Sequence, residues 1–255
     1  MGKFDGRVAM ITGAGAGIGR DSALAFAREG AAVAVVDVRG ERAEQTAELI
    51  RQAGGQAAAF LCDVRGGEGV EATTAEVLAR FGRIDALFNN AGTTRQGDVV
   101  TVSFADWEMV LDVNLRGTFL VSRAVLPHML ARGSGAIINM GSIDGLAGDA
   151  NMAAYNAAKG AVVNLSRSMA IDFGPRGVRT NCICPGAIGT PAVLKMFTDT
   201  VRGAMEAATP LRRIGRPGDI ASLAVFLASD DASFINGATM VADGGLMART
   251  GMPLG

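Results

Sequence analysis

Short apolar runs alternate with segments of helical character along the whole of this 255-residue chain. Roughly seven such runs occur, and each has the length of a strand that is buried on both faces. The expected strands are 8–11, 32–36, 57–61, 86–88, 135–140, 178–184 and 238–241. Strands that are each followed by a helix favour a parallel sheet with helices on both faces. We therefore expect residues 1–255 to form one doubly wound α/β domain.

Residues of helical pattern fill most of the chain between the strands. The expected helices are 22–28, 41–53, 70–80, 107–132, 155–169 and 217–228. One segment breaks this regularity, since residues 191–216 mix apolar and polar side chains without a clear period. Such a segment suits a mobile lid over a pocket, and it equally suits a plain surface excursion.

Charge and hydropathy narrow the class of partner. The formal net charge is −1, so nothing favours a nucleic acid. Residues 1–7 lack the apolar stretch of a signal peptide, and no run approaches the ~20 apolar residues of a membrane span. We expect a soluble, cytoplasmic protein with no membrane partner. Cys62, Cys182 and Cys184 are expected to be buried thiols rather than metal ligands, because His128 is the only histidine.

A glycine-rich turn, Gly13-x-x-x-Gly17-x-Gly19, joins the first expected strand to the first expected helix. This arrangement aims backbone N–H groups and a helix N-terminus at a phosphate group. Its spacing differs from the general G-x-G-x-x-G dinucleotide fingerprint, and glycines also serve ordinary tight turns. The turn therefore indicates a nucleotide site only together with other residues.

Asp37 ends the second expected strand roughly 20 residues after the glycines, where a dinucleotide site needs a carboxylate for the ribose hydroxyls. A carboxylate there repels a 2′-phosphate, which predicts NAD rather than NADP. Ala16 agrees with NAD, whereas Arg39 does not. The alternative is that Asp37 caps the helix expected over 41–53. Asp63 has a similar ambiguity, between capping the next helix and reaching the adenine.

Polar residues also stand at the ends of later strands. The loop Asn89-Asn90-Ala91-Gly92 suits a turn that holds its shape beside a ligand. Ser142 comes just after the fifth expected strand, where open α/β sheets bind ligands. Asn114 lies inside an expected helix although asparagine is a poor helix former, so it either distorts the helix usefully or is merely tolerated.

Tyr155 is the only tyrosine of the chain, and Lys159 is one of three lysines. If 155–169 is helical, their spacing places both side chains on one face, about one turn apart. An ammonium group favours the phenolate form of a neighbouring phenol, which gives an acid–base group usable near neutral pH. The alternative is a surface pair on a core helix.

Together these residues resemble the short-chain dehydrogenase/reductase family over essentially the whole chain. The matching residues are Thr12-Gly13-x-x-x-Gly17-x-Gly19, Asp37, Asp63, Asn89-Asn90-Ala91-Gly92, Asn114, Ser142, Tyr155-x-x-x-Lys159, Pro185-Gly186 and Thr190. The resemblance implies a Rossmann-type fold with a cofactor half over roughly 1–140 and a substrate and catalytic half over roughly 141–255. It also implies an NAD-dependent oxidoreductase of secondary alcohols and ketones, commonly a homotetramer, in which the tail 246–255 could reach a neighbouring subunit.

The resemblance implies a catalytic tetrad of Asn114, Ser142, Tyr155 and Lys159. Tyr155 gives or takes the proton, and Ser142 hydrogen-bonds the substrate oxygen. Lys159 holds the nicotinamide ribose and lowers the pKa of the phenol, helped by the cationic ring of the oxidised cofactor. Asn114 anchors a water between Lys159 and solvent.

The resemblance also implies two sets of binding residues. The cofactor set is Gly13, Gly17, Ile18, Gly19, Asp37, Asp63, Val64, Asn90, Ala91, Gly92, Tyr155, Lys159, Pro185, Gly186, Ile188 and Thr190. The expected substrate set is Ser142, Asp144, Met152, Tyr155 and Ala187, with Thr93, Thr94 and the 191–205 segment completing the pocket. This largely apolar lining favours a cyclic or medium-sized alcohol.

Asp144 is unusual for its place, two residues after Ser142. Its carboxylate either binds a second hydroxyl of a polyol or cyclic diol, or pairs with an arginine such as Arg95. Two other functions compete with the alcohol dehydrogenase. A 3-oxoacyl-[acyl-carrier-protein] reductase usually prefers NADPH and needs a basic patch, for which 212–216 offers arginines. A non-catalytic NAD-binding regulator needs no acid–base group.

Overall fold

Seven parallel strands form one sheet in the computed structural model, which describes residues 2–248. The spatial order of the strands is β3-β2-β1-β4-β5-β6-β7. Their bounds are β1 Val8–Thr12, β2 Ala32–Asp37, β3 Gln56–Leu61, β4 Ala86–Asn89, β5 Gly135–Met140, β6 Val178–Pro185 and β7 Thr239–Ala242. Each predicted strand is confirmed within about two residues, and so is the doubly wound α/β fold.

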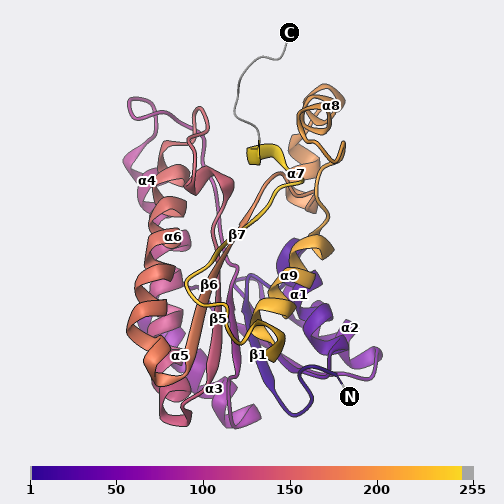
Figure 1. Cartoon of the computed structure of the whole chain (residues 1–255), viewed down its shortest axis with the longest axis vertical. Helices are drawn as coiled ribbons and strands as arrows, with labels where there is room; N and C mark the ends of the chain where they lie inside the picture. The colour runs from indigo at the N-terminus through magenta and orange to yellow at the C-terminus, as the bar shows by residue number, and fades with distance from the viewer. Residues whose placement is uncertain (1, 249–255) are drawn as a thin grey trace.

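Helices cover both faces of the sheet (Figure 1). Their bounds are α1 Gly17–Arg28, α2 Gly40–Gln52, α3 Gly67–Phe81, α4 Phe104–Leu111, α5 Gly117–Arg132, α6 Ala153–Phe173, α7 Pro191–Met196, α8 Asp199–Ala208 and α9 Pro217–Ala228. Core residues of α1, α2 and α9 pack on one face, and those of α3, α5 and α6 pack on the other. Among these helices and the others within residues 2–248, none has the length and apolar character to cross a membrane.

Strand β1, in the interior of the sheet, shows why the apolar runs do not alternate with polar residues. Ala9 and Ile11 of β1 belong to the core beneath α1 and α9, whereas Met10 belongs to the opposite core. All three side chains are at most 1% exposed. Burial of a large apolar side chain stabilises the fold by about 1.5–3 kcal/mol, so a polar residue on either face of this strand is costly.

The order of the strands reverses next to β1. The chain runs outward from β1 to β3 and then returns to place β4 on the other side of β1. Such a reversal opens a crevice at the carboxyl ends of the two strands, where this class of sheet binds ligands. Thr12 ties the two strand ends together, because its Oγ1 accepts hydrogen bonds from the N–H groups of Asn90 and Ala91, each at 3.1 Å.

Asn114 interrupts the long helix that was predicted over 107–132. Helices α4 and α5 are joined by a π-helical turn, Asp112–Arg116, with Asn114 at its centre. The Asn114 amide donates to the carbonyl of Val110 at 2.8 Å and to that of Thr93 at 2.7 Å. Its side chain thus competes with the backbone hydrogen bonds of the helix and widens one turn.

The irregular segment 191–216 contains two helices that were not predicted. Thr190 and Thr198 cap α7 and α8 by accepting from Val193 N and Val201 N, both at 3.3 Å. Both helices project above the sheet, and no residue of either is buried. The prediction that the cysteines are buried free thiols is confirmed.

Candidate active site

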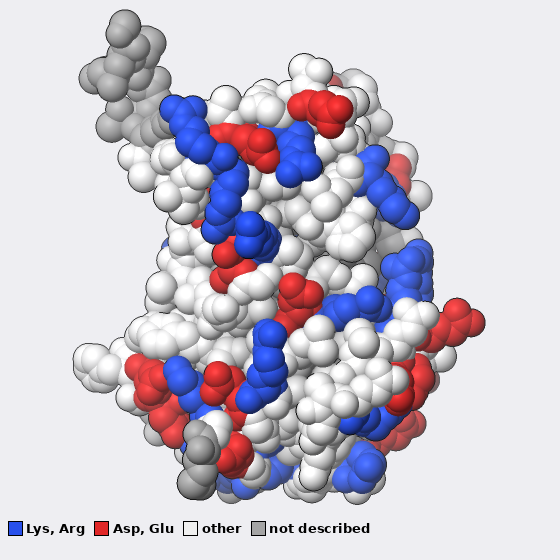
Figure 2. Space-filling view, turned by 90° about the vertical axis from the view of Figure 1, so that its right-hand side faces the viewer, with Lys and Arg blue, Asp and Glu red and all other residues white. Residues whose placement is uncertain are grey.

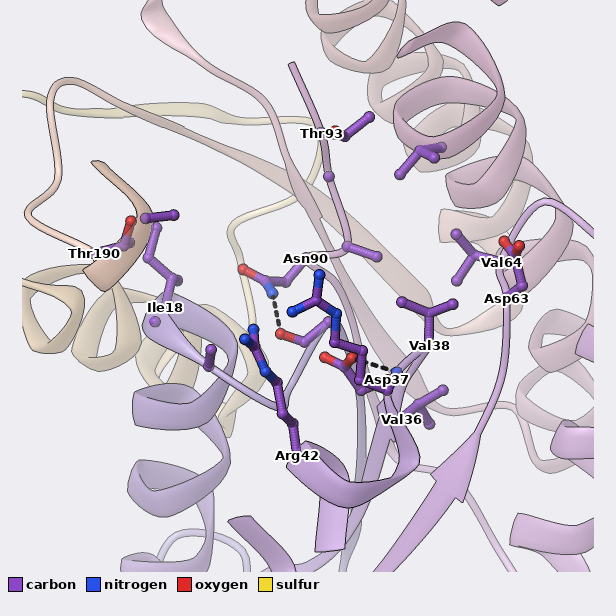
Figure 3. A pocket seen from close by; sticks show the side chains of 18 of the residues that line it. Ile18, Val36, Asp37, Val38, Arg42, Asp63, Val64, Asn90, Thr93 and Thr190 are labelled. Atoms are coloured by element: carbon purple, nitrogen blue, oxygen red, sulfur yellow. Dashed lines mark hydrogen bonds between the residues drawn. The ribbon is translucent and has the colours of Figure 1, made fainter. Parts of the chain in front are cut away.

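A cavity of about 700 Å³ opens at the carboxyl ends of β1, β2, β3 and β4. Figure 3 shows Ile18 and Thr190 on one side of it and Asp63 and Val64 on the other, with Asp37 and Asn90 between them. The predicted cofactor residues that line it are Gly13, Gly17, Ile18, Asp37, Asp63, Val64, Asn90, Ala91, Gly92 and Thr190. Residues that are far apart in the sequence therefore meet in one cavity.

The glycine turn brings the start of α1 to the edge of this cavity. A Cβ atom on Gly19 would lie 2.2 Å from the carbonyl oxygen of Gly13, so α1 packs directly on the turn only because residue 19 is glycine. Gly13 itself has φ +63°, a conformation that favours glycine. Ala16 precedes α1 and its side chain caps no N–H group of the first turn. These donors suit the diphosphate of a dinucleotide.

Asp37 is held in place by backbone donors. Its carboxylate accepts from Gly15 N and Arg39 N, both at 2.9 Å. Arg39 is the residue before α2, so the alternative that Asp37 caps this helix is wrong. Arg42, one turn into α2, also lines the cavity, and the sequence analysis missed it. Its position could have indicated this place in the cavity, because Arg42 lies five residues after Asp37, on the helix that follows the strand.

Asp63 forms an ion pair with Arg65 and accepts from its backbone N–H at 3.0 Å. This hydrogen-bonded arginine holds the pKa of Asp63 below its ordinary value. Helix α3 begins at Gly67 after Gly66, so Asp63 does not cap it. Arg65 and Lys195 also line the cavity and were missed, although Lys195 is one of only three lysines. These cations complement a diphosphate cofactor.

Asn90, the residue after β4, bonds to the end of β1 at the edge of the cavity. Its side-chain amide donates to the carbonyl oxygens of Thr12 at 2.9 Å and Gly13 at 3.2 Å. The predicted cofactor residues Pro185, Gly186 and Ile188 do not line this cavity. Ile188 and the predicted substrate residue Ala187 instead line a second cavity of about 810 Å³ near the end of β7. The roles of these four residues stay predictions.

Ser142, Tyr155 and Lys159 come together at the carboxyl end of β5. Lys159 is 2% exposed, and its Nζ donates to the carbonyl of Met140 at 2.8 Å. The same Nζ lies 5.4 Å from the centre of the Tyr155 ring. The Ser142 hydroxyl forms a hydrogen bond that acts to lower the pKa of Tyr155. The alternative of a surface pair on a core helix is therefore wrong.

Burial shifts the pKa of both groups in this pair in the protein without cofactor. Burial, followed by the charge of Asp144, raises the pKa of Tyr155 to about 12, and burial lowers the pKa of Lys159 to about 8. In the protein alone Lys159 therefore does not bring the phenol into the neutral range, because both groups lose more hydration than their proximity restores.

Asn114 lies beside the lysine and is 1% exposed. A Cβ atom on Gly92 would lie 2.9 Å from Asn114 Oδ1 and 3.7 Å from Lys159 Nζ, so these two groups face the same point. Within residues 2–248, Asn114 Oδ1 has no hydrogen-bond partner. A buried amide oxygen beside an ammonium group suits the predicted water relay.

The predicted substrate residues Asp144 and Met152 flank this group. Met152 precedes α6, and its sulfur accepts from the Thr94 hydroxyl at 3.7 Å. Asp144 does not pair with Arg95, which forms an ion pair with Asp106 at 3.2 Å instead. The interpretation of Asp144 as a structural partner of Arg95 is therefore wrong.

Comparisons with known proteins identify the family of the chain. The model of the family described as "Enoyl-(Acyl carrier protein) reductase" matches residues 13–247. Meso-2,3-butanediol dehydrogenase of Serratia marcescens is 41% identical over 251 residues, which cover 98% of each protein. D-threitol dehydrogenase of Mycolicibacterium smegmatis is 42% identical over 243 residues, covering 95% of this chain and 94% of that protein. A crystal structure of levodione reductase is 37% identical with a TM-score of 0.92, covering 96% and 99% of the two chains. The chain belongs to the short-chain dehydrogenase/reductase family.

Proposed function

We propose that this protein is an NAD-dependent oxidoreductase that interconverts secondary alcohols and ketones. The observation that carries the proposal is the grouping of Ser142, Tyr155 and buried Lys159 beside the cavity that contains Asp37. Proton transfer at the substrate oxygen needs such an acid–base group, and hydride transfer needs the dinucleotide. The named relatives act on butanediol, threitol and levodione, which supports an alcohol or ketone substrate.

Each residue of the catalytic group has its own role in the proposed reaction. NAD, when bound, accepts or supplies the hydride. Tyr155 takes the proton of the alcohol during oxidation and returns it during reduction. Ser142 hydrogen-bonds the reacting oxygen and so holds it where the proton passes. Lys159 contributes its positive charge beside the phenol and binds the ribose, and Asn114 supports the water that connects Lys159 to solvent.

Asp37 supports NAD over NADP. Its carboxylate is fixed by two backbone N–H groups and lines the cavity where a 2′-phosphate would be repelled. Arg39 and Arg42 also line the cavity, and they work against this preference. Absorbance at 340 nm with each cofactor and a panel of secondary alcohols and ketones tests both the activity and the preference. Greater catalytic efficiency with NADP would contradict the proposed role of Asp37.

A 3-oxoacyl-[acyl-carrier-protein] reductase is the second candidate, and the matching family is described by another reductase of acyl carrier protein substrates. Such a reductase needs a basic surface that binds the carrier protein, for which residues 212–216 offer arginines. Arg213, however, forms an ion pair with Asp219 at 2.6 Å. Figure 2 shows basic and acidic side chains interspersed on one face of the molecule. Turnover of acyl thioesters in preference to simple alcohols would favour this candidate, whereas NAD binding without any turnover would favour a regulator.

The proposal extends to the substrate and the assembly. The proposed substrate is a cyclic or medium-sized, largely apolar alcohol, as expected from the predicted substrate residues. Residues 191–216 would form a lid, and roughly 1–140 the cofactor half.

An apolar groove between helices is lined by Leu111, Leu115, Phe119 and Leu165, and Ile171 of α6 is 75% exposed. This surface supports a homotetramer, here proposed to be cytoplasmic. Light scattering after size exclusion tests the tetramer; the tail from 249 onward lies outside the described residues.

A further inference from the structure

Asp144 places a carboxylate beside the catalytic group. Its backbone N–H donates to Ser142 Oγ at 3.2 Å, and its charge raises the pKa of Tyr155. The residue belongs to a single helical turn, Ile143–Gly145, that follows β5. A Cβ atom on Gly145 would lie 2.6 Å from the backbone of Lys159, so this turn is packed tightly against α6. The backbone of Asp144 is therefore fixed beside Ser142 and α6.

The half-buried carboxylate forms no ion pair with any residue from 2 to 248. Two candidate partners have other contacts, since Arg95 pairs with Asp106 and Lys159 donates to Met140. Burial and the like charge of Asp149 raise the pKa of Asp144, and only Ser142 and Lys159 oppose them. The Ser142 hydroxyl also serves Tyr155. A carboxylate that has lost part of its hydration without a dedicated donor is costly for the fold.

We propose that Asp144 accepts a hydrogen bond from a second hydroxyl group of the substrate, on a carbon next to the reacting carbinol. The inference rests on the proposed function and specifies its substrate class, namely vicinal diols and the corresponding α-hydroxyketones. The reacting oxygen is held by Ser142, and Asp144 lies two residues further on the same turn, which suits a neighbouring hydroxyl.

Charge selects a hydroxyl over other polar groups. An anionic substituent would be repelled by Asp144 and by Asp149 of the same loop. An ammonium substituent would enter a site that already holds the Lys159 cation and, during oxidation, a cationic nicotinamide ring. A neutral O–H group gives Asp144 a donor without adding charge, and hydrogen bonds to charged acceptors are among the stronger ones.

The test compares cyclohexane-1,2-diol with cyclohexanol in steady-state oxidation by NAD. We expect the wild type to favour the diol in kcat/KM by about tenfold or more, and Asp144→Ala to lower this ratio about 10- to 100-fold. Asp144→Asn keeps an acceptor oxygen and should retain part of the preference. Glu68→Gln removes the charge of an exposed carboxylate in α3 and should leave the ratio unchanged.

Each outcome bears on a different claim. Equal efficiencies for the two substrates, or an Asp144→Ala enzyme with the wild-type ratio, would overturn the inference and leave the proposed function intact. Preference for 2-aminocyclohexanol over the diol would also overturn it, in favour of a cation site. If the wild type oxidised none of these alcohols and reduced none of the ketones, the proposed function would fail and the inference with it. Thermal unfolding and NAD binding of both Asp144 variants show whether they are folded.

Discussion

The cofactor cavity and the catalytic group satisfy their polar side chains in different ways. In the cavity, Asp37 is bound by two backbone N–H groups, and Asp63 is paired with Arg65. In the catalytic group, Asp144 has no ion pair and Asn114 Oδ1 has no hydrogen-bond partner within residues 2–248. The two carboxylates of the cavity are thus held by the protein itself, whereas the catalytic group leaves polar atoms for what binds there.

Because the two regions differ in this way, we expect that each can be disabled without the other. Tyr155→Phe should disable the catalytic group alone, and it should have the largest effect. The variant loses the proton donor while keeping the ring, so we expect turnover to fall about 10²- to 10⁴-fold. NAD affinity should stay nearly unchanged, because the cavity residues are untouched. Steady-state kinetics measures the turnover. Quenching of the protein's fluorescence on titration with NAD measures the affinity. A large loss of NAD affinity would show that the two regions are not separable.

Gly19→Ala should disturb the cofactor cavity rather than the catalytic group. The added methyl group would lie 2.2 Å from the carbonyl oxygen of Gly13, so α1 has to move away from the glycine turn. We expect a loss of about 1–3 kcal/mol in the free energy of unfolding and weaker NAD binding. The matched control is Gly69→Ala in α3, where nothing lies within 4 Å of the new atom. This control should stabilise the protein by about 0.5–1 kcal/mol. Equal effects in chemical denaturation would contradict the close contact.

Asp37→Asn should change the choice of cofactor with a smaller effect. The amide keeps an acceptor oxygen for Gly15 or Arg39 but removes the charge that repels a 2′-phosphate. We expect the ratio of kcat/KM for NAD over NADP to fall about tenfold, which corresponds to about 1.4 kcal/mol. Glu41→Gln, an exposed acid of α2 outside the cavity lining, is the control and should leave the ratio unchanged. An unchanged ratio in Asp37→Asn would assign the preference to another group.

The cavity was also the more predictable of the two regions. Glycines at a strand end and a carboxylate at the next strand end have positions that the fold dictates, so Gly13, Gly17 and Asp37 were found from their spacing together with the family resemblance. Arg42, Arg65 and Lys195 were missed because an exposed cation has no periodicity that separates a ligand contact from a solvated face. Helices α7 and α8 bury no residue, and α8 was missed although Val201, Met205 and Ala208 recur at helical spacing.

In the catalytic group, residue types were predictable but their energetics were not. The spacing of Tyr155 and Lys159 placed both on one face, and the helix confirms it. The sign of the Tyr155 pKa shift depends on how much hydration the phenol loses, which only the packing around it shows. The same holds for Asp144, because a sequence cannot show whether Arg95 pairs with it or with Asp106.

The smallest predicted effect concerns pH and links these two residues. Asp144 and Cys184 raise the pKa of Tyr155 in addition to burial, while Ser142 lowers it. Oxidation needs the phenolate as base, so kcat/KM for oxidation rises with pH through the Tyr155 pKa. Asp144→Asn removes a negative charge that disfavours the phenolate, and we therefore expect this rising limb to move to lower pH. Cyclohexanol is the substrate of choice for the pH profile, because it has no second hydroxyl that depends on Asp144. Asp149→Asn should move the limb less, since Asp149 is not among the groups that shift the Tyr155 pKa. A limb that stays in place in Asp144→Asn would mean that the Asp144 charge does not reach the phenol, and that the raised pKa arises from burial alone.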